Sequence, residues 1–273
     1  MKRLILLTTA LLCGQLHAAQ LTLDLGSSPR TWETQALLAH PKAQTITIDN
    51  DVSYKRQMTY RAVPVAVLLD GIKPDDHLQA VALDGFAAEM SAAPLLGKSG
   101  AQAWLAVEDP AKPWPPLAEG KPGAGPFYLV WTHPEAGNIG PEQWPFQVAS
   151  IKRLASVAER FPALLPDPKL KANDPVNQGF VLFQKNCLAC HRLNGAGDAQ
   201  VGPDLNIPYS PTEYFAEGYL KRYIRDPQSL RHWPQAKMPA FTPAVLPDGE
   251  LDLLVGYLKH MAKRKVPVQQ AGF

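Results

Sequence analysis

The sequence predicts two domains of different fold class, an N-terminal α+β domain followed by a C-terminal domain built only from helices. The chain has 273 residues, which is long enough for two separate cores. Short runs of alternating apolar and polar residues, the pattern of half-buried strands, recur as far as residue 154. After a proline-rich stretch at residues 161–168, the apolar residues instead follow the helical period.

Residues 1–19 are expected to be a secretory signal peptide. Lys2 and Arg3 precede an apolar run at residues 4–12, which is too short for a stable membrane-spanning helix, and Ala18-Ala19 suits cleavage. A retained N-terminal anchor is the alternative. The sequence thus predicts a periplasmic protein with no transmembrane segment after signal cleavage.

Charge is distributed unevenly between the two halves. Residues 20–168 carry 12 basic and 16 acidic side chains, and residues 169–273 carry 13 and 9. Such asymmetry can orient docking between proteins, although scattered solvated charges give the same totals. The basic residues are neither dense nor interleaved with aromatic ones, so we expect no nucleic-acid binding.

The first domain is predicted to span residues 20–160. We expect strands at residues 21–25, 45–48, 58–61, 78–82, 86–90, 101–107, 127–132 and 146–154. Ser28-Pro29 indicates the start of a helix that continues to about Ala39, and Pro64 the start of a short one at residues 65–69. Asp84-Gly85 between two strands is typical of a hairpin turn.

Residues 161–172 are predicted to be a proline-rich, fairly stiff linker, and residues 173–273 the helical domain. Asp174-Pro175 indicates the start of a helix that ends near Lys185. A last helix begins at Asp248, with an apolar stripe formed by Leu251, Leu254, Val255 and Leu258. Gly179 lies in mid-helix, where it costs about 1 kcal/mol relative to alanine, and this predicts a close helix crossing.

Cys187-Leu188-Ala189-Cys190-His191 has the spacing of a c-type haem attachment site. Two thiols three positions apart can each form a thioether to one porphyrin vinyl group, and the following imidazole of His191 can ligate the iron. A redox CxxC pair does not need the histidine. A structural zinc site needs four ligands, and no other cysteine follows the predicted signal peptide.

This region also resembles the class I cytochrome c family. The resemblance rests on Gly179-Phe180 before the cysteines, on Gly202-Pro203-Asp204-Leu205, on Met238-Pro239 and on Tyr257 in the last helix. It implies one covalent haem c with Met238 as the second axial ligand, His232 being the alternative. It also implies that the Pro203 carbonyl accepts a hydrogen bond from His191. Arg225 and Trp233 are candidates for hydrogen bonds to the haem propionates.

The N-terminal domain resembles the small form of the molybdopterin-binding oxidoreductase domain of the sulfite oxidase type. The residues that carry the resemblance lie at 59–69, 82–86, 125–131 and 144–148. Members of that family hold molybdenum through a cysteine thiolate, yet residues 20–160 contain no cysteine, and Ala or Leu cannot replace a thiolate. We therefore expect a domain of this fold without molybdenum and without molybdopterin.

The function predicted from the sequence is one-electron transfer rather than catalysis. The N-terminal domain is expected to dock or position a periplasmic redox protein, either a dehydrogenase donor or an oxidase acceptor. The alternative is a haem-containing oxidoreductase, in which that domain binds a substrate or molybdopterin and passes electrons to the haem. A third possibility is a binding or sensing module with a redox-linked change.

Overall fold

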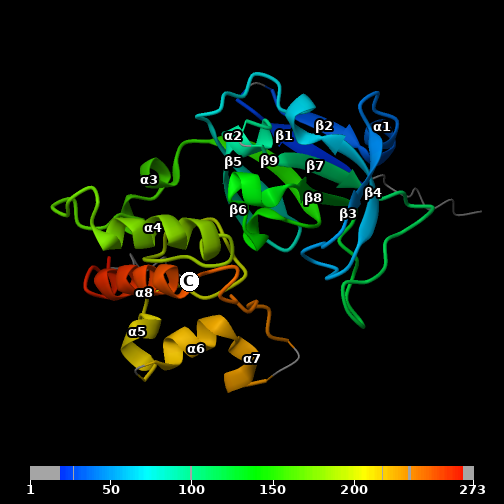
Figure 1. Cartoon of the computed structure of the whole chain (residues 1–273). Coiled ribbons are helices and arrows are strands. Elements are labelled where there is room, and N and C mark those ends of the chain that lie inside the picture. The colour runs from blue at the N-terminus through cyan, green and yellow to red at the C-terminus, as the bar shows by residue number, and fades with distance from the viewer. Residues whose placement is uncertain (1–18, 27, 99, 217, 233–234, 267–273) are drawn as a thin grey trace, which may run out of the picture.

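The computed structural model describes residues 19–26, 28–98, 100–216, 218–232 and 235–266, and Figure 1 shows two bodies lying side by side. The first half is rich in β-structure, and the second consists of helices joined by loops. Residues 1–18 of the predicted signal peptide and the propionate candidate Trp233 lie outside the described residues. No helix in the described ranges is both long and apolar enough to cross a bilayer.

One sheet of the N-terminal domain has five strands in the order β2-β1-β9-β5-β6. These strands are β2 (Arg30–Glu33), β1 (Gln20–Asp24), β9 (Val148–Leu154), β5 (His77–Ala82) and β6 (Ala87–Ser91). β1 pairs in parallel with β9, whereas the other neighbours are antiparallel. The strand nearest the C-terminal end of the domain therefore lies in the middle of the sheet.

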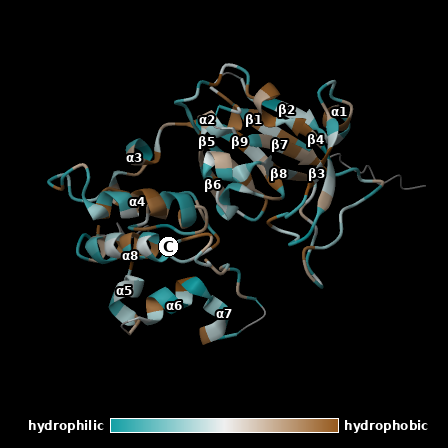
Figure 2. Cartoon of the chain, in the orientation of Figure 1, coloured by the Kyte–Doolittle hydropathy of each residue, from teal (hydrophilic) through white to brown (hydrophobic). Residues whose placement is uncertain are grey.

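The second sheet has four antiparallel strands in the order β3-β4-β7-β8. They are β3 (Gln44–Ile48), β4 (Met58–Pro64), β7 (Gln102–Val107) and β8 (Phe127–Thr132). Strands β7 and β8 are buried along almost their whole length, and Figure 2 shows hydrophobic residues concentrated in the strands. The core of the domain thus lies around these two sheets.

The two helices that the sequence predicted in this domain are shorter in the structure, and three further short ones occur. These helical elements are α1 (Thr34–Leu38), α2 (Ala92–Leu95) and the single turns η1 (Val65–Val67), η2 (Pro134–Gly137) and η3 (Pro141–Gln143). The prediction of helix from Ser28 was wrong for residues 30–33, which form β2. The pairing of Leu21 with Trp32 in the sheet outweighs the local Ser-Pro signal. The hairpin at Asp84-Gly85 is confirmed, with Gly85 at φ +87°.

The C-terminal domain is organised around two crossing helices, α4 (Pro175–Asn186) and α8 (Asp248–Ala262) (Figure 1). A Cβ placed on Gly179 of α4 would lie 2.2 Å from the Leu253 carbonyl oxygen and 2.7 Å from Tyr257 Cβ. The predicted close crossing is therefore confirmed, because only a glycine fits there. The Tyr257 ring packs against Phe180 and Phe183 of α4, with ring centroids 5.6 and 5.3 Å away.

Shorter helices complete this domain: α3 (Val157–Arg160), η4 (Pro162–Leu164), α5 (Pro211–Tyr214), α6 (Tyr219–Arg225) and α7 (Pro227–Leu230). The stretch predicted as a linker is packed against the helices instead of spanning a gap. Leu164 is fully buried, and its carbonyl accepts a hydrogen bond of 2.7 Å from the Tyr257 hydroxyl. Its apolar residues join the helical core, so proline content alone was a poor guide.

One of the contacts between the two domains is a group of four residues that we call the interdomain bridge: Gln79 of β5, Glu89 of β6, Arg160 of α3 and Asp198. The Arg160 guanidinium donates to Glu89 at 2.6 Å and to Asp198 at 2.9 Å. The Gln79 amide donates to the same two carboxylates, at 2.7 Å each. Glu89 is almost fully buried, so these charge-assisted bonds hold the sheet domain against the helical domain.

Candidate haem-attachment site

The two thiols lie on one tight turn at the end of α4. The amides of Cys190 and His191 both donate to the Cys187 carbonyl, at 3.1 and 2.9 Å. This turn sets Cys187 and Cys190 about one helical turn apart, the separation that two neighbouring vinyl groups require. Both are free cysteines, so no disulfide competes for the sulfur atoms.

The His191 ring is fixed through its Nδ1 atom. Nδ1 lies 2.8 Å from the Pro203 carbonyl oxygen, so the hydrogen bond expected from the family resemblance is present. The carbonyl can only accept, so Nδ1 carries the proton and Nε2 keeps its lone pair. Burial lowers the pKa of His191, although the bond to Pro203 opposes this. A neutral imidazole with a free Nε2 is the form that binds a metal.

Gly202 and Asp204 hold the loop that reaches His191. A Cβ on Gly202 would lie 2.5 Å from the His191 ring, so this position has no room for a side chain. The Asp204 carboxylate accepts hydrogen bonds from the backbone amides of Asn206, Ile207 and Gly195, at 2.8, 2.9 and 2.6 Å. These bonds fix the loop on both sides of Pro203, and with it the orientation of the imidazole.

Met238 is partly buried and packs against the core of the helical domain. It comes from the loop between α7 and α8, whereas His232, the alternative ligand, is exposed. The other helical-domain methionine, Met261, is buried in α8 and belongs to the core. The role of Met238 as the second axial ligand stays a prediction, supported by its contact with the same apolar core.

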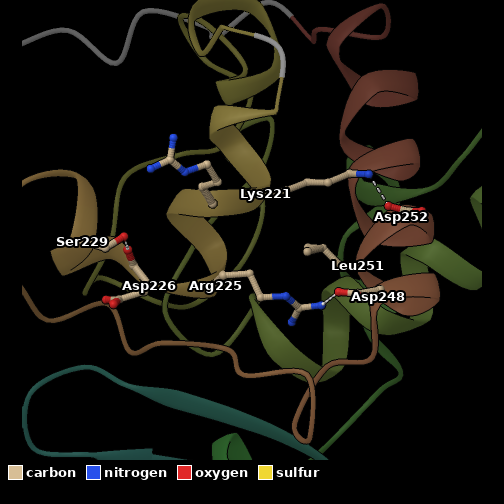
Figure 3. A pocket seen from close by; sticks show the side chains of 8 residues that line it. Lys221, Arg225, Asp226, Ser229, Asp248, Leu251 and Asp252 are labelled. Carbon is tan, nitrogen blue, oxygen red and sulfur yellow. Dashed lines mark hydrogen bonds and ion pairs between the residues drawn. The ribbon is translucent and has the colours of Figure 1, made fainter.

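Arg225 is engaged elsewhere in the structure. Its guanidinium donates to the carbonyls of Phe241 and Leu246, at 2.7 and 2.6 Å, and to Asp248 at 2.6 Å. Figure 3 shows it reaching from α6 across a groove to Asp248, with Lys221 and Asp252 forming a parallel ion pair. Arg225 therefore joins α6 to the start of α8, and its contact with a propionate stays a prediction.

The N-terminal domain contributes directly to the surroundings of the thiols, which the sequence did not reveal. The Ala87 amide of β6 donates to the Ala189 carbonyl, inside the attachment motif, at 3.0 Å. Glu142 of η3 is buried, and its charge contributes, after burial itself, to raising the pKa of both Cys187 and Cys190. No local sequence signal marks either contact, because both depend on how the domains pack.

Among the described residues, no group of three or more His, Cys, Asp or Glu side chains lies close enough together to hold a metal ion by itself. In the sheet domain His77 is hydrogen-bonded to Glu89, next to the interdomain bridge. The chemistry-bearing side chains that the structure brings together are therefore Cys187, Cys190 and His191, with Pro203 behind the imidazole.

These residues fit a covalently bound haem. Two free thiols lie on one turn, the imidazole is held in the correct tautomer, and a loop glycine leaves space at its ring. No curated protein matches the chain. Residues 176–262 match the family model described as Cytochrome c, which spans α4, the attachment motif and α8. The C-terminal part of the chain is therefore a cytochrome c domain, which implies covalently bound haem c and supports haem-based electron transfer.

Proposed function

We propose that the chain is a periplasmic electron-transfer protein with a single haem c, whose N-terminal domain positions a redox partner. The observation that carries this proposal is the contact of β6 with the attachment motif, in which the Ala87 amide donates to the Ala189 carbonyl at 3.0 Å. A domain seated on the haem-binding turn controls access to that side of the cofactor. The chemistry supplied by the bound haem is the gain and loss of one electron at the iron.

The residues of the chain have separate parts in this function. Cys187 and Cys190 attach the haem covalently, and His191 provides the proximal ligand. Pro203 keeps the imidazole protonated at Nδ1, so the lone pair on Nε2 would be available to the haem iron. Met238 is the second ligand, a soft thioether that favours the reduced iron relative to a second imidazole.

We also propose that the N-terminal domain has the fold of the sulfite oxidase type without its metal. Support comes from the resemblance at residues 59–69, which cover most of β4 and all of η1, and at residues 125–131, which begin just before β8 and cover most of it. Residues 20–160 contain no cysteine to bind molybdenum. The molybdenum form of the competing function, an oxidoreductase with molybdopterin in this domain, needs a cysteine ligand that residues 20–160 do not contain.

The test uses the full chain, matured with its haem in an exporting host. We expect one iron per chain, no molybdenum, and the weak long-wavelength absorption band that marks methionine ligation in the resembled family. Stoichiometric molybdenum would contradict the electron-carrier proposal and favour the oxidoreductase. Absence of covalent haem would contradict both.

A substitution tests the second ligand. Met238→Ala is expected to abolish the long-wavelength band, to lower the midpoint potential and to let the reduced iron bind carbon monoxide, because the sixth position opens. Met261→Leu, a core change in α8, is the matched control and should leave the spectrum unchanged. An unchanged spectrum in Met238→Ala would assign the ligand to another residue.

A further inference from the structure

Glu142 is an unusual carboxylic acid in this molecule. It belongs to η3 of the sheet domain and is only 8% exposed. Within the described part of the chain its carboxyl makes no hydrogen bond and no ion pair. Burying an unpaired carboxylate costs free energy, and in practice such a group is driven toward its neutral form. Burial raises the pKa of Glu142 to about 7.

The backbone on either side of Glu142 is fixed. The side-chain amide of Gln143 donates to the Lys185 carbonyl at 3.0 Å, and the backbone carbonyl of Gln143 accepts from the Trp131 indole at 2.8 Å. The Gly140 amide donates to the Gln143 side chain at 2.9 Å. Glu142 is therefore held near the end of α4, because its neighbour Gln143 is bonded to Lys185, which lies two residues before Cys187.

The Glu142 carboxyl lies within electrostatic range of both attachment thiols. Its charge is the largest electrostatic contribution to the raised pKa of Cys187 and of Cys190, after the effect of burial. When the haem is attached, these sulfur atoms are neutral thioethers on the edge of the porphyrin. Glu142 is then a buried titratable group beside a centre whose charge changes by one unit.

The other charged groups around this position are already paired. Lys185 of α4 donates to Asn138 at 3.0 Å, and burial lowers the pKa of Lys185. Glu89 of β6 is bound to His77, Gln79 and Arg160, and Tyr257 of α8 donates to Leu164. At the β5–β6 turn Asp84 faces Lys237 at 3.8 Å. Each of these groups has a bonded partner that stabilises its present charge state. Glu142 has no such partner among the described residues, so its charge can respond to that of the iron.

We propose that Glu142 is a redox-linked proton acceptor, which couples the electron transfer of the haem to uptake of one proton. When a donor delivers one electron to the iron, Glu142 takes one proton from water, and it releases that proton when the electron leaves. The net charge buried at the site stays constant through the cycle. The attraction between the oxidised iron and the carboxylate favours the ionised acid, and reduction weakens it.

This inference rests on the proposed haem-based function, and one experiment separates the two. The midpoint potential of the full haem-loaded chain is measured by potentiometric titration between pH 5 and pH 9. A reversible one-electron couple at any pH supports the haem function; its absence would overturn both. For one proton per electron, a tenfold change in proton concentration shifts the potential by about 59 mV, so we expect a fall approaching that slope around neutral pH.

Glu142→Gln keeps the size of the side chain and removes its titration. We expect its midpoint potential to be nearly independent of pH in the same interval. Glu142→Asp should restore a pH dependence, displaced along the pH axis because the shorter acid has a different burial. Glu135→Gln, an exposed acid in the neighbouring η2, is the matched control and should retain the wild-type slope.

A second readout follows the proton itself. Reduced-minus-oxidised infrared difference spectra should show a protonated carboxyl signal on reduction, lost in Glu142→Gln and kept in Glu135→Gln. A wild-type potential independent of pH, or a Glu142→Gln slope equal to the wild-type slope, would overturn the inference. If Glu142→Gln does not mature, the comparison of Glu142→Asp with wild type decides: an identical pH profile and an identical carboxyl signal would overturn it.

Discussion

The surroundings of Asp51 in the sheet domain and the attachment site in the helical domain differ in how their polar groups are bonded. In the sheet domain the buried Asp51 accepts hydrogen bonds from the amides of Ser53 and Tyr54 and from the hydroxyls of Tyr60 and Tyr128, between 2.7 and 3.2 Å. In the helical domain the described residues give the thiols no hydrogen-bond partner, and His191 uses only one ring nitrogen. Satisfied networks stabilise a fold, whereas the groups left open here are those that a haem satisfies.

Glu142 is the exception to this contrast between satisfied and open polar groups. Glu142 belongs to the sheet domain, yet it is buried without a partner and faces the thiols of the helical domain. The haem-attachment site therefore includes a residue of the sheet domain as well as residues of the helical domain. Substitutions in each domain separate their contributions to haem binding and to stability, beginning with the largest expected effect.

Removing both attachment thiols should affect the helical domain most. Cys187→Ala with Cys190→Ala is expected to eliminate covalent haem completely and to destabilise α4 and α8, while the two sheets remain folded. Haem staining of a denaturing gel and circular dichroism on heating measure the two effects. Gln178→Ala, at an exposed position of α4, should retain full haem content. Covalent haem in the double variant would contradict the assignment of the site.

Filling the helix crossing should be nearly as damaging. Gly179→Val places a side chain where Cβ alone would lie 2.2 Å from the Leu253 carbonyl oxygen. We expect a loss of about 3 kcal/mol in the free energy of unfolding, measured by denaturant titration. Gly256→Ala on α8 is the control, because its Cβ meets no atom within 4 Å, and it should stabilise the chain by up to about 1 kcal/mol. Equal effects of the two changes would show that the crossing is looser than described.

Breaking the interdomain bridge tests whether the two regions unfold together. Arg160→Met leaves Glu89 and Asp198 without their cation, and we expect a cost of about 2 kcal/mol and two separate unfolding transitions. Differential scanning calorimetry resolves the transitions. Arg153→Met, which breaks the more exposed pair with Asp76 inside the sheet domain, should cost less than about 1 kcal/mol. A single unaltered transition in Arg160→Met would mean that the bridge does not couple the domains.

The smallest effect expected is the pH dependence contributed by Glu142. Its pKa is raised from 4.5 to about 7 on folding, so the folded chain binds a proton more tightly than the unfolded chain. The stability that this gives is fully present below pH 4.5 and is lost as the pH rises through 7. Glu142→Gln should therefore gain about 1–2 kcal/mol relative to wild type between pH 5 and pH 8. Urea titrations at the two pH values measure this gain, and a constant difference would argue against the buried acid.

Local patterns predicted the parts of the fold that local interactions form. The Cys187–His191 spacing, the apolar stripe of α8 and the mid-helix Gly179 all depend on residues one or two turns apart. β2 was missed because Ser28-Pro29 signals a helix start, whereas pairing with β1 decides the structure. The packing of residues 161–168 and the burial of Glu142 depend on contacts between segments far apart in the chain. The spacing of apolar residues and the residue types at turns do not show which distant segments come into contact.

The contact between the sheet domain and the attachment motif can be tested through a single amide hydrogen, that of Ala87. The Ala87 amide donates to the Ala189 carbonyl at 3.0 Å, so its hydrogen should exchange slowly with deuterium in the haem-loaded full chain. Site-resolved exchange by nuclear magnetic resonance, on the reduced diamagnetic protein, gives this rate. Protection that persists in wild type and falls in Arg160→Met would support a sheet domain fixed on the haem-binding turn. Exchange in wild type as fast as that of an unstructured peptide would contradict it.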